Sequence, residues 1–383
     1  MRIVYCLDSI RYIGGTERVT ITKANALAEL SGNEVYVVVM DDKGQRGNLV
    51  QPLSANVKLI NLGFNYYEGD SGRSSIANLF VYARRRRQYR KLLYKTLLSL
   101  KPDVVISVGQ NEKYMLLSMR KRSWKVIREF HFERNYRKKM ASSKREKVFA
   151  GLLEFYDFSF KVKNYDKVVV LTEEDKNTNW KGWNNIAVIP NPVSFKSQEV
   201  SSVNDKTIIS VGRLELSKNY SSLIRAFDIV RKTHRDWVLK IYGDGSQRMP
   251  LQRMIDSSNL NENIKLMGNT SDVIHVLKDA SIFAFSSISE GFGLAIVESM
   301  ECGVPVVSYQ CQCGPKEIID DGKDGFLVPV GDEKMMADRI CTLIEDEELR
   351  RKMGTAAKEK AKKYHIENIT KQWMALFEEL VNK

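Results

Sequence analysis

Two glutamates eight positions apart mark the stretch of this sequence with the clearest chemical potential. Glu290 precedes Gly-Phe-Gly, and Glu298 lies in the apolar run that begins at Leu294. Gly291 and Gly293 allow a ligand to approach the backbone closely. A helix that begins at this loop would direct free N–H groups and the positive end of its dipole at an anion. Carboxylates on either side of that anion can accept hydrogen bonds from hydroxyl groups. The pattern therefore predicts a phosphate site between two polyhydroxylated groups, as in a nucleotide sugar.

A basic segment at 212–219 is the next candidate. It follows the strand-like run 207–211 and precedes a helical pattern, and α/β proteins bind ligands at the carboxyl ends of parallel strands. The guanidinium of Arg213 can fork onto two phosphate oxygens, and Lys218 adds a second positive charge. These two cations could neutralise a diphosphate without a metal ion. A solvated basic pair at the start of a helix is the alternative.

Three less specific signals also follow strand-like runs. Gly14 and Gly15 permit a tight turn that aims backbone N–H groups across a cleft, although a simple loop before a helix explains them equally well. His131 ends the run 126–130, where it could hydrogen-bond a substrate hydroxyl, but a lone histidine is more often structural. Gly243 begins a Gly-Asp-Gly sequence after another strand-like run and has similar alternatives.

Strand-like and helical patterns alternate along nearly the whole chain. The strand-like runs of the first half are 2–7, 34–40, 57–60, 103–107, 125–130, 167–171 and 186–189. Those of the second half are 206–211, 237–242, 263–266, 281–285, 305–308 and 326–328. Helical periodicity fills most of the intervals. Such alternation predicts parallel sheets with helices on both faces, so the sequence indicates an α/β protein with two Rossmann-like domains.

The predicted domain boundary lies at Pro190-Asn191-Pro192, because two prolines around one residue cannot continue a helix or a central strand. Residues 1–190 would form the first domain and residues 191–365 the second. The last segment, 366–383, is helical by pattern. A length of 383 residues also favours two domains over one.

Composition narrows the class of protein. Apolar residues make up 43% of the chain, which is ordinary for a globular protein. The sequence contains no run of about 18 or more apolar residues, so no transmembrane helix is expected. Residues 1–7 are typical of a buried strand rather than of a signal peptide. Five cysteines without metal-type spacing indicate reduced thiols and a cytoplasmic protein. The adjacent acidic pairs at 41–42 and 320–321 suit metal chelation poorly, so neither a metal ion nor another cofactor is expected.

Taken in order, the motifs of the second domain resemble those of the family 4 retaining glycosyltransferases, which have the GT-B fold. The resemblance rests on Glu290 to Glu298 with the intervening Gly-Phe-Gly, and on Gly212-Arg213 with Lys218. It extends to the segments 188–193, 243–245, 303–307 and 314–319. The first domain agrees only in Gly14-Gly15 and His131. The resemblance implies two Rossmann-like domains that face a central cleft, with a C-terminal helix that crosses back to the N-terminal domain.

The resemblance also implies a role for each matched position. Glu298 would hold the ribose hydroxyls, and Glu290 would face the donor sugar near the reacting carbon. Arg213 and Lys218 would clamp the diphosphate, and His131 would contact the sugar and help to stabilise an oxocarbenium-like state. Glu290, Arg213, Lys218 and His131 are therefore the expected catalytic residues. Further donor contacts are expected from Gly14, Gly15, Gly243, Leu266, Met267, Gly291, Phe292, Gly293 and Leu294.

The implied reaction moves a hexosyl unit from a nucleotide sugar to a glycan or lipid-linked acceptor, with retention of configuration and without a metal ion. Breaking the anomeric bond leaves negative charge on the diphosphate, which the two cations and a helix N-terminus would stabilise. A UDP-sugar is favoured over a GDP-sugar as the donor. Assembly of a bacterial surface polysaccharide is the setting that the resemblance implies.

Positive charge is concentrated in the first half of the chain. Residues 1–190 contain 34 Lys and Arg against 19 Asp and Glu, whereas the remainder contains 26 against 28. Residues 84–101 hold eight basic residues, no acid and an apolar stripe, and residues 134–160 combine basic with aromatic residues. Such helices can lie on an anionic membrane. We therefore hypothesise that the first domain docks on the inner leaflet. A solvated cationic face around an ordinary core stripe is the alternative.

Two other functions compete with the predicted glycosyltransferase activity. A non-enzymatic protein that binds nucleic acid or a membrane would explain the net charge of +13. It would not explain the cleft motifs, which lie in the acidic half, so no nucleic-acid partner is expected. A sugar-nucleotide epimerase on the same scaffold would explain nucleotide binding but not the basic first domain.

Overall fold

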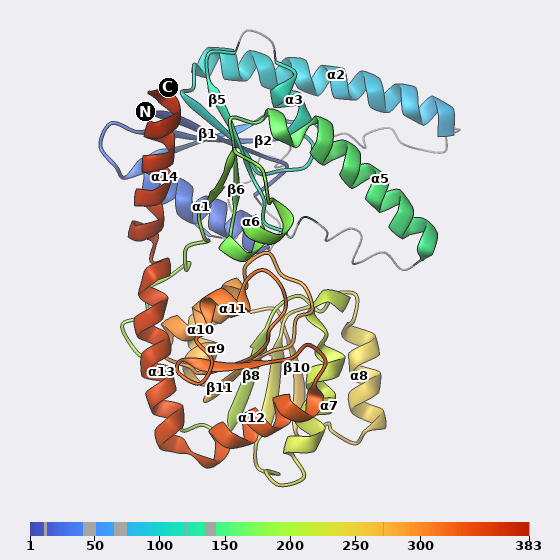
Figure 1. Ribbon diagram of the computed structural model, residues 1–383, viewed down its shortest axis with the longest axis vertical. Helices are drawn as coiled ribbons and strands as arrows, with labels where there is room; N and C mark the ends of the chain where they lie inside the picture. Colours follow the sequence, from blue (N-terminus) through green and yellow to red (C-terminus); the bar gives the residue numbers. More distant parts are fainter. Residues whose placement is uncertain are drawn as a thin grey trace.

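Two α/β domains stand one above the other in the computed structural model (Figure 1). The structure describes residues 1–10, 14–40, 51–64, 75–119, 122–132, 134, 143–270 and 272–382. Within these ranges each domain is built on one sheet, and all paired strands of both sheets are parallel. The predicted fold class is therefore confirmed.

The first domain contains a seven-stranded sheet among the described residues. Its order is β3 (Val57–Asn61), β2 (Glu34–Val39), β1 (Arg2–Leu7), β4 (Val104–Ser107), β5 (Lys125–Glu129), β6 (Lys167–Val170) and β7 (Ile186–Val188). The central strands are short, consist mainly of apolar residues and are buried almost throughout. Helices cover both faces of a parallel sheet, so such strands have no polar face.

Two sets of helices sandwich this sheet. α1 (Gly15–Ala28) and α14 (Ile366–Val381) pack on one face. α2 (Ser75–Leu100), α3 (Lys113–Leu117) and α5 (Lys144–Phe160) lie on the other. A short helix, α6 (Glu173–Asn179), follows β6 and lies next to the second domain. The core of the first domain is therefore completed by the C-terminal helix.

The second domain has a six-stranded sheet over the part of the chain that is described. Its order is β10 (Ile264–Gly268), β9 (Val238–Tyr242), β8 (Thr207–Val211), β11 (Ile282–Phe285), β12 (Val306–Tyr309) and β13 (Gly325–Val328). α7 (Tyr220–Val230), α8 (Arg248–Ser257) and α12 (Glu333–Glu345) cover one face. α9 (Val273–Lys278), α10 (Leu294–Glu301), α11 (Pro315–Ile318) and α13 (Glu347–Ala361) cover the other. Single 3₁₀ turns occur at Val162–Asn164, Leu216–Lys218 and Lys362–Tyr364.

The chain passes between the domains twice. It leaves the first domain after β7, and it returns through His365 into α14, which runs up the side of the first domain (Figure 1). α14 is held there because Trp373 and Phe377 are buried against the sheet and α1. The helix predicted at 366–381 and its crossing back to the N-terminal domain are both present.

The apolar stripe predicted within 84–101 has a structural role. Tyr89, Leu93 and Leu97 are fully buried in the core between α2 and the sheet, while the basic residues of this helix face outward. This segment is therefore a cationic surface over an ordinary core stripe. Three of the seven basic residues within 134–160, namely Arg137, Lys138 and Lys139, lie outside the described residues.

Candidate active site

A cavity of about 730 Å³ lies between the two domains. The residues that line it follow β1, β4 and β5 in the first domain, and β8, β9, β10 and β11 in the second. Both sheets therefore point their carboxyl ends at one cleft, which is where ligands bind in open α/β sheets.

Most residues predicted from the sequence meet in this cavity. It is lined by Gly14, Gly15, His131, Arg213, Lys218, Gly243, Glu290, Gly291, Phe292, Gly293, Leu294 and Glu298. Leu266 and Met267 do not line it, although we expected them against the nucleotide base. They belong to β10, and the cavity wall is formed instead by Asn269 and Thr270, which follow that strand. The strand predicted at 263–266 thus ends two residues later, at Gly268.

Lys218 and Glu290 form an ion pair on the cavity wall. Lys218 Nζ lies 2.5 Å from Glu290 Oε1, and both side chains are largely buried. The loop of Glu290 is tied to the turn of Lys218, because Ile288 N–H donates to the Ser217 carbonyl and Ser286 Oγ donates to the Lys218 carbonyl. The two charges are thus held in place before any ligand arrives.

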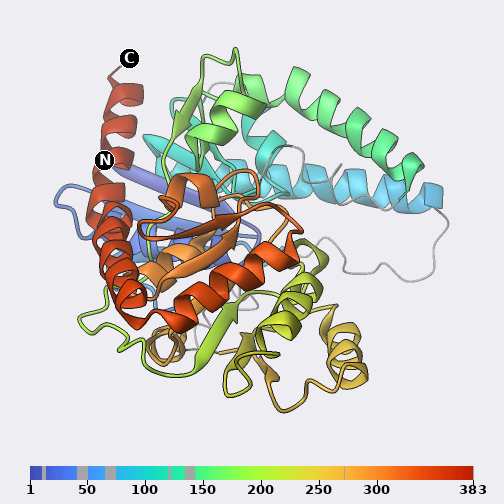
Figure 2. The same cartoon turned by 60° about the horizontal axis from the view of Figure 1, so that its bottom comes forward.

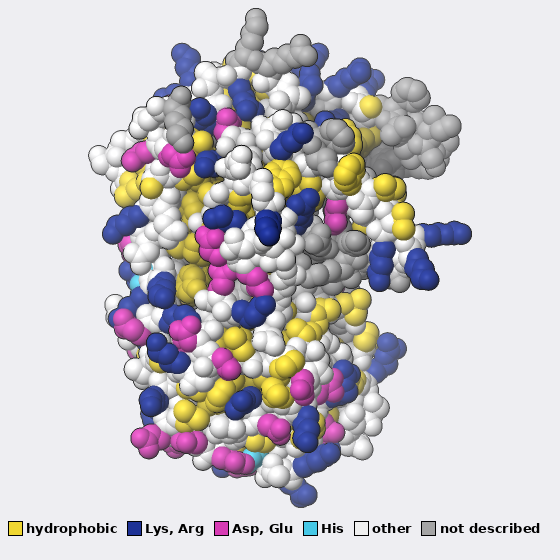
Figure 3. All heavy atoms as spheres, viewed as in Figure 1, with side chains coloured by type: hydrophobic (Ala, Val, Ile, Leu, Met, Phe, Trp, Pro, Cys, Tyr) yellow, Lys and Arg dark blue, Asp and Glu magenta, His cyan; other side chains and the backbone are white. Residues whose placement is uncertain are grey.

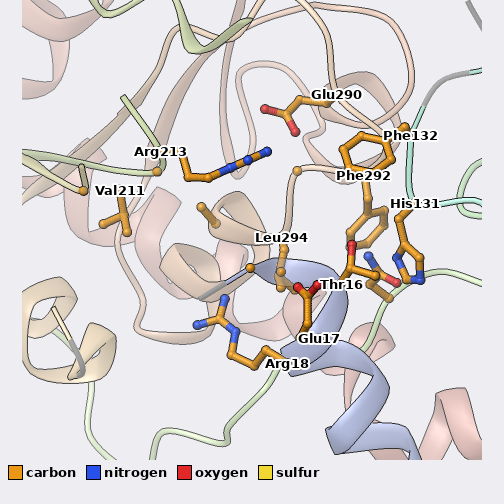
Figure 4. Close-up of a pocket in the computed structure, with 18 of the residues that line it drawn as sticks. Thr16, Glu17, Arg18, His131, Phe132, Val211, Arg213, Glu290, Phe292 and Leu294 are labelled. Atoms are coloured by element: carbon orange, nitrogen blue, oxygen red, sulfur yellow. The ribbon is translucent and has the colours of Figure 1, made fainter. Parts of the chain in front are cut away.

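The N-terminus of α10 opens into the same cavity. Gly293 precedes the helix with φ of 99°, a left-handed conformation that favours glycine, and no side chain of the described residues caps this end. The first N–H groups of α10 therefore remain available for an anion. Arg213 extends toward this end from the loop after β8 (Figure 4).

Glu298 lies on α10 and is buried. Its Oε1 atom is 2.6 Å from Nη2 of Arg18, which comes from α1 of the other domain. Burial raises the pKa of Glu298, whereas the positive charge and hydrogen bond of Arg18 act in the opposite direction. Arg18 and the adjacent Glu17 both lie beside the cavity in the first turns of α1 (Figure 4).

The domains also touch through backbone at the cavity. Gly291 packs directly against the carbonyl group of His131, and a Cβ atom at this position would overlap that oxygen. At a second contact between the domains, the Glu317 carboxylate accepts hydrogen bonds from the N–H groups of Glu173 and Glu174 at the start of α6. Glycine at 291 is therefore what permits this close approach of the two domains.

A buried charge cluster holds His131. Nε2 of His131 lies 3.3 Å from Oε1 of Glu129, which also pairs with Lys23. Burial alone would raise the pKa of Glu129, but Lys23 and His131 together lower it to about 2. Burial lowers the pKa of Lys23, and Glu129 offsets part of that effect. The Lys23 ammonium also lies 4.8 Å from the ring centre of Trp373 in α14. The histidine is thus braced by the core of its own domain.

Several cavity residues were absent from the predicted site, and three of them, Asp8, Glu17 and Arg18, are charged. Asp8 follows β1 directly and accepts hydrogen bonds from the backbone N–H groups of Gln110 and Asn111. Glu17 and Arg18 come from the first turns of α1. Burial raises the pKa of Glu17. The position of Asp8 at a strand end was a signal that could have been used. For Arg18, only the partner on α10 reveals the role.

The site is therefore a cleft with fixed cations, carboxylates and a free helix N-terminus. The cations suit an anionic ligand, and the carboxylates suit hydroxyl groups on either side of it. Within the described ranges, no group of three or more His, Cys, Asp or Glu side chains is arranged to hold a metal ion.

Two family profiles match nearly the whole chain. The profile described as Glycosyl transferases group 1 matches residues 194–360. The profile described as Glycosyltransferase Family 4 matches residues 13–196. Their junction falls between β7 and β8.

The chain is also similar to curated proteins, among them two glycosyltransferases and one phosphotransferase. An uncharacterized glycosyltransferase of Haemophilus influenzae is 26% identical over 380 residues, which cover 98% of this chain and 99% of that protein. An N-acetylgalactosaminyltransferase of Campylobacter jejuni, named for a diphospho-undecaprenol-linked substrate, is 34% identical over 45% of this chain and 46% of its own length. An exopolysaccharide phosphotransferase of Streptomyces coelicolor is 36% identical over 225 residues, and this chain covers only 24% of its length.

Solved structures share the fold. TarM of S. aureus, in a complex that contains UDP, superposes with a TM-score of 0.78 at 17% identity and covers 98% of this chain and 99% of its own. HepE of Anabaena, in complex with UDP-glucose, superposes with a TM-score of 0.74 at 18% identity, over 99% of this chain and 100% of its own. At these identities the likeness concerns the fold alone.

Proposed function

The chain belongs to the group 1 glycosyltransferases of the GT-B fold, and from this premise we propose that it transfers a hexosyl unit from a UDP-sugar to a glycan or lipid-linked acceptor. The proposal includes retention of anomeric configuration, independence of metal ions, a cytoplasmic location and a role in bacterial surface polysaccharide assembly. One observation carries it: the Lys218–Glu290 pair lies in the same cleft as Arg213 and the free N-terminus of α10.

The cations account for departure of the nucleotide. When the bond between the anomeric carbon and the diphosphate oxygen breaks, its electron pair leaves with the diphosphate. Arg213, Lys218 and the N–H groups of α10 would stabilise that charge, as preorganised donors do wherever charge develops. In this proposal, these groups would supply the positive charge that a metal ion contributes in other enzymes.

The carboxylates account for recognition of the sugar nucleotide. Glu290 is held close to the cations and would accept hydrogen bonds from hydroxyls of the donor sugar, whereas Glu298, deeper in the second domain, would receive the ribose. His131 enters from the first domain, braced by Glu129, and would contact the sugar beside the reacting carbon. With retention, the acceptor hydroxyl attacks from the face that the diphosphate leaves. The departing phosphate oxygen is then the nearest base for its proton.

Two structural neighbours and one relative support the choice of substrates. UDP and UDP-glucose are bound in the TarM and HepE structures, which supports a uridine nucleotide as donor. The Campylobacter jejuni relative is named for a lipid diphosphate substrate, which supports a lipid-linked acceptor. The match to that relative covers less than half of this chain, so the acceptor is the part of the proposal that most needs an experiment.

Calorimetry with UDP, GDP and ADP in the presence of EDTA tests the donor site. We expect UDP alone to bind with appreciable affinity, and Glu298→Ala to lose that binding. Glu262→Ala, which removes an exposed carboxylate from the same domain, should bind UDP as the wild type does. Absence of binding for all three nucleotides would contradict the proposal.

Turnover tests the reaction itself. UDP-sugars and diphosphate lipid-linked sugars are incubated with the protein, and UDP release is measured together with the anomeric configuration of the product by NMR. Transfer with release of free UDP and a retained configuration is expected. A changed sugar that is still attached to its nucleotide would identify an epimerase instead.

A further inference from the structure

Helix α5 carries large apolar side chains that face solvent. Val148, Phe149, Leu152 and Phe155 are 63–65% exposed, and Tyr156 is 52% exposed. Their spacing of one, four, seven and eight positions from Val148 places them on one side of a helix. Exposed apolar groups that cluster on one element indicate an interaction site.

The opposite side of α5 is attached to the domain. Ala150 and Phe158 are buried, and the ring of Phe158 packs edge-on against Trp180 with 5.2 Å between centres. The guanidinium of Arg134 lies 4.4 Å from the centre of the same Phe158 ring. The C-terminal half of α5 is thus fixed in place by its inner side, and its outer side contributes little to the core.

Basic residues accompany this apolar side. Lys144, Arg145 and Lys147 are exposed at the N-terminal end of α5, and Figure 3 shows Lys and Arg side chains at the tip of this helix, with hydrophobic ones along it. α2 projects from the same side of the domain in both views (Figures 1 and 2). It adds the exposed residues Arg84, Arg86, Arg87, Arg90, Lys91 and Lys95.

We propose that the outer side of α5, together with the basic surface of α2, is a docking surface for a bilayer that contains anionic lipid. Apolar side chains beside Lys and Arg match the boundary between acyl chains and anionic head groups. The described part of the chain contains no helix long and apolar enough to cross a membrane, so this docking places helices on the surface of the bilayer. α5 supplies the inserted groups and α2 supplies charge, because the apolar stripe of α2 is buried.

Charge favours the bilayer over two other occupants. A second copy that docked through the same surface would bring two basic helices together, and like charges across an interface oppose association. A nucleic acid would use the basic residues but would leave the apolar side chains of α5 in water. An anionic bilayer satisfies both groups at once.

Flotation with lipid vesicles tests the docking surface directly. Wild-type protein should float with vesicles of phosphatidylcholine and phosphatidylglycerol but not with phosphatidylcholine alone, and less so at high salt, which screens the charges. Phe149→Ser with Leu152→Ser should reduce partitioning at least tenfold, since burial of each large apolar side chain changes the partition coefficient by roughly this factor. Met249→Ser with Met267→Ser, at exposed positions of the second domain, is the matched control and should float normally.

A variant with reversed charges on α2 tests the contribution of this helix separately from that of α5. Arg86→Glu with Arg87→Glu should weaken binding to anionic vesicles at least tenfold, given a change of about fivefold per basic residue lost. Lys232→Glu with Lys352→Glu, at exposed positions of the second domain, should leave binding unchanged. Wild-type protein that stays unbound at low salt would overturn the proposal. So would a dimer in light scattering that the α5 variant abolishes, since the surface would then join two copies.

The outcome is independent of the proposed reaction. Flotation requires no donor and no turnover, so it can succeed even if the transfer reaction is not found. Each α5 variant is also checked for UDP binding by calorimetry. Unchanged binding shows that a loss of flotation comes from the surface rather than from unfolding.

Discussion

Arg18 of the first domain and Glu298 of the second form an ion pair across the cleft, with 2.6 Å between Nη2 and Oε1. The carboxylate is buried, whereas the guanidinium retains partial contact with the cavity. In the proposed function the same carboxylate receives the ribose hydroxyls of the donor. Arg18 and the donor would therefore compete for Glu298 in the proposed function, and the pair joins the two domains across the cleft.

Removal of the Arg18 guanidinium should tighten nucleotide binding. In Arg18→Met, the donor no longer has to displace a guanidinium from Glu298, so we expect UDP to bind about threefold more tightly, in line with the strength of a partly exposed pair. Isothermal calorimetry measures this change. Arg18→Lys retains the charge and should lie close to the wild type.

The opposite result has a definite meaning. If Arg18→Met weakens UDP binding, then Arg18 turns toward the diphosphate when the donor is present, and the competition argument is wrong. Arg122→Met provides a control, because Arg122 pairs with Asp166 within the first domain and away from the cavity.

Gly291 controls how closely the domains approach. A methyl group at this position would overlap the His131 carbonyl oxygen, so Gly291→Ala should hold the cleft open. We expect UDP binding within about threefold of wild type, since the other donor contacts of the second domain remain, and kcat reduced about 100-fold by misplacement of the two halves of the site. Small-angle scattering should show a larger radius of gyration. In α5, a Cβ atom at Gly151 would meet no atom of the described residues within 4 Å, so Gly151→Ala should behave as wild type.

The sequence was sufficient to predict the secondary-structure elements and the residues that the second domain contributes to the candidate site. Each predicted strand is present within about two residues, because apolar runs rich in β-branched residues, such as Val35–Val39, are typical of strands in a buried sheet. The Glu290 loop and Arg213 were found because local motifs encode them. Their contact partners within the same domain, such as Lys218, lie close to a strand end and were found in the same way.

Contacts between the domains could not be predicted from local sequence patterns. The pairing of Arg18 with Glu298 joins residues 280 positions apart in sequence, and no local pattern on α1 marks the arginine. The apolar stripe of α2 shows a different limit. Tyr89, Leu93 and Leu97 have the same spacing whether they face a bilayer or a core, and only the fold places them inside. β10 ends at Gly268 rather than at 266, so the cavity wall at this strand is formed by Asn269 and Thr270. The contact of Leu266 and Met267 with the donor stays a prediction.

The Lys218–Glu290 pair should behave as a unit in catalysis. Lys218→Met removes a donor aimed at developing charge, and we expect kcat to fall by about 100- to 1,000-fold. Glu290→Gln should cost a similar factor. Because each mutation disrupts the same arrangement, the double mutant should be little worse than either single mutant. Steady-state kinetics on the four proteins give the coupling, and fully additive losses would show that the two side chains act separately.

A buried carboxyl near the cleft gives a prediction about pH. Glu112 precedes α3 and is fully buried, with Oε1 accepting a hydrogen bond from Ser107 Oγ and lying 3.7 Å from Nη1 of Arg128. Burial, followed by the nearby charge of Asp8, raises the pKa of Glu112 from 4.5 to about 7. Between these two values the folded protein binds more protons than the unfolded chain, so the free energy of unfolding falls as the pH rises through this window.

Glu112→Gln should remove that dependence. In wild type, a pKa displaced from 4.5 to about 7 lowers the free energy of unfolding by roughly 3 kcal/mol as the pH rises from the lower to the higher value, at about 1.4 kcal/mol per pH unit. The glutamine does not titrate, so the variant should gain stability relative to wild type as the pH rises from 5 to 8. Urea unfolding at closely spaced pH values measures the difference. Glu262→Gln, whose carboxylate is exposed, should keep the wild-type slope, and an identical slope in Glu112→Gln would show that Glu112 stays ionised in the folded protein.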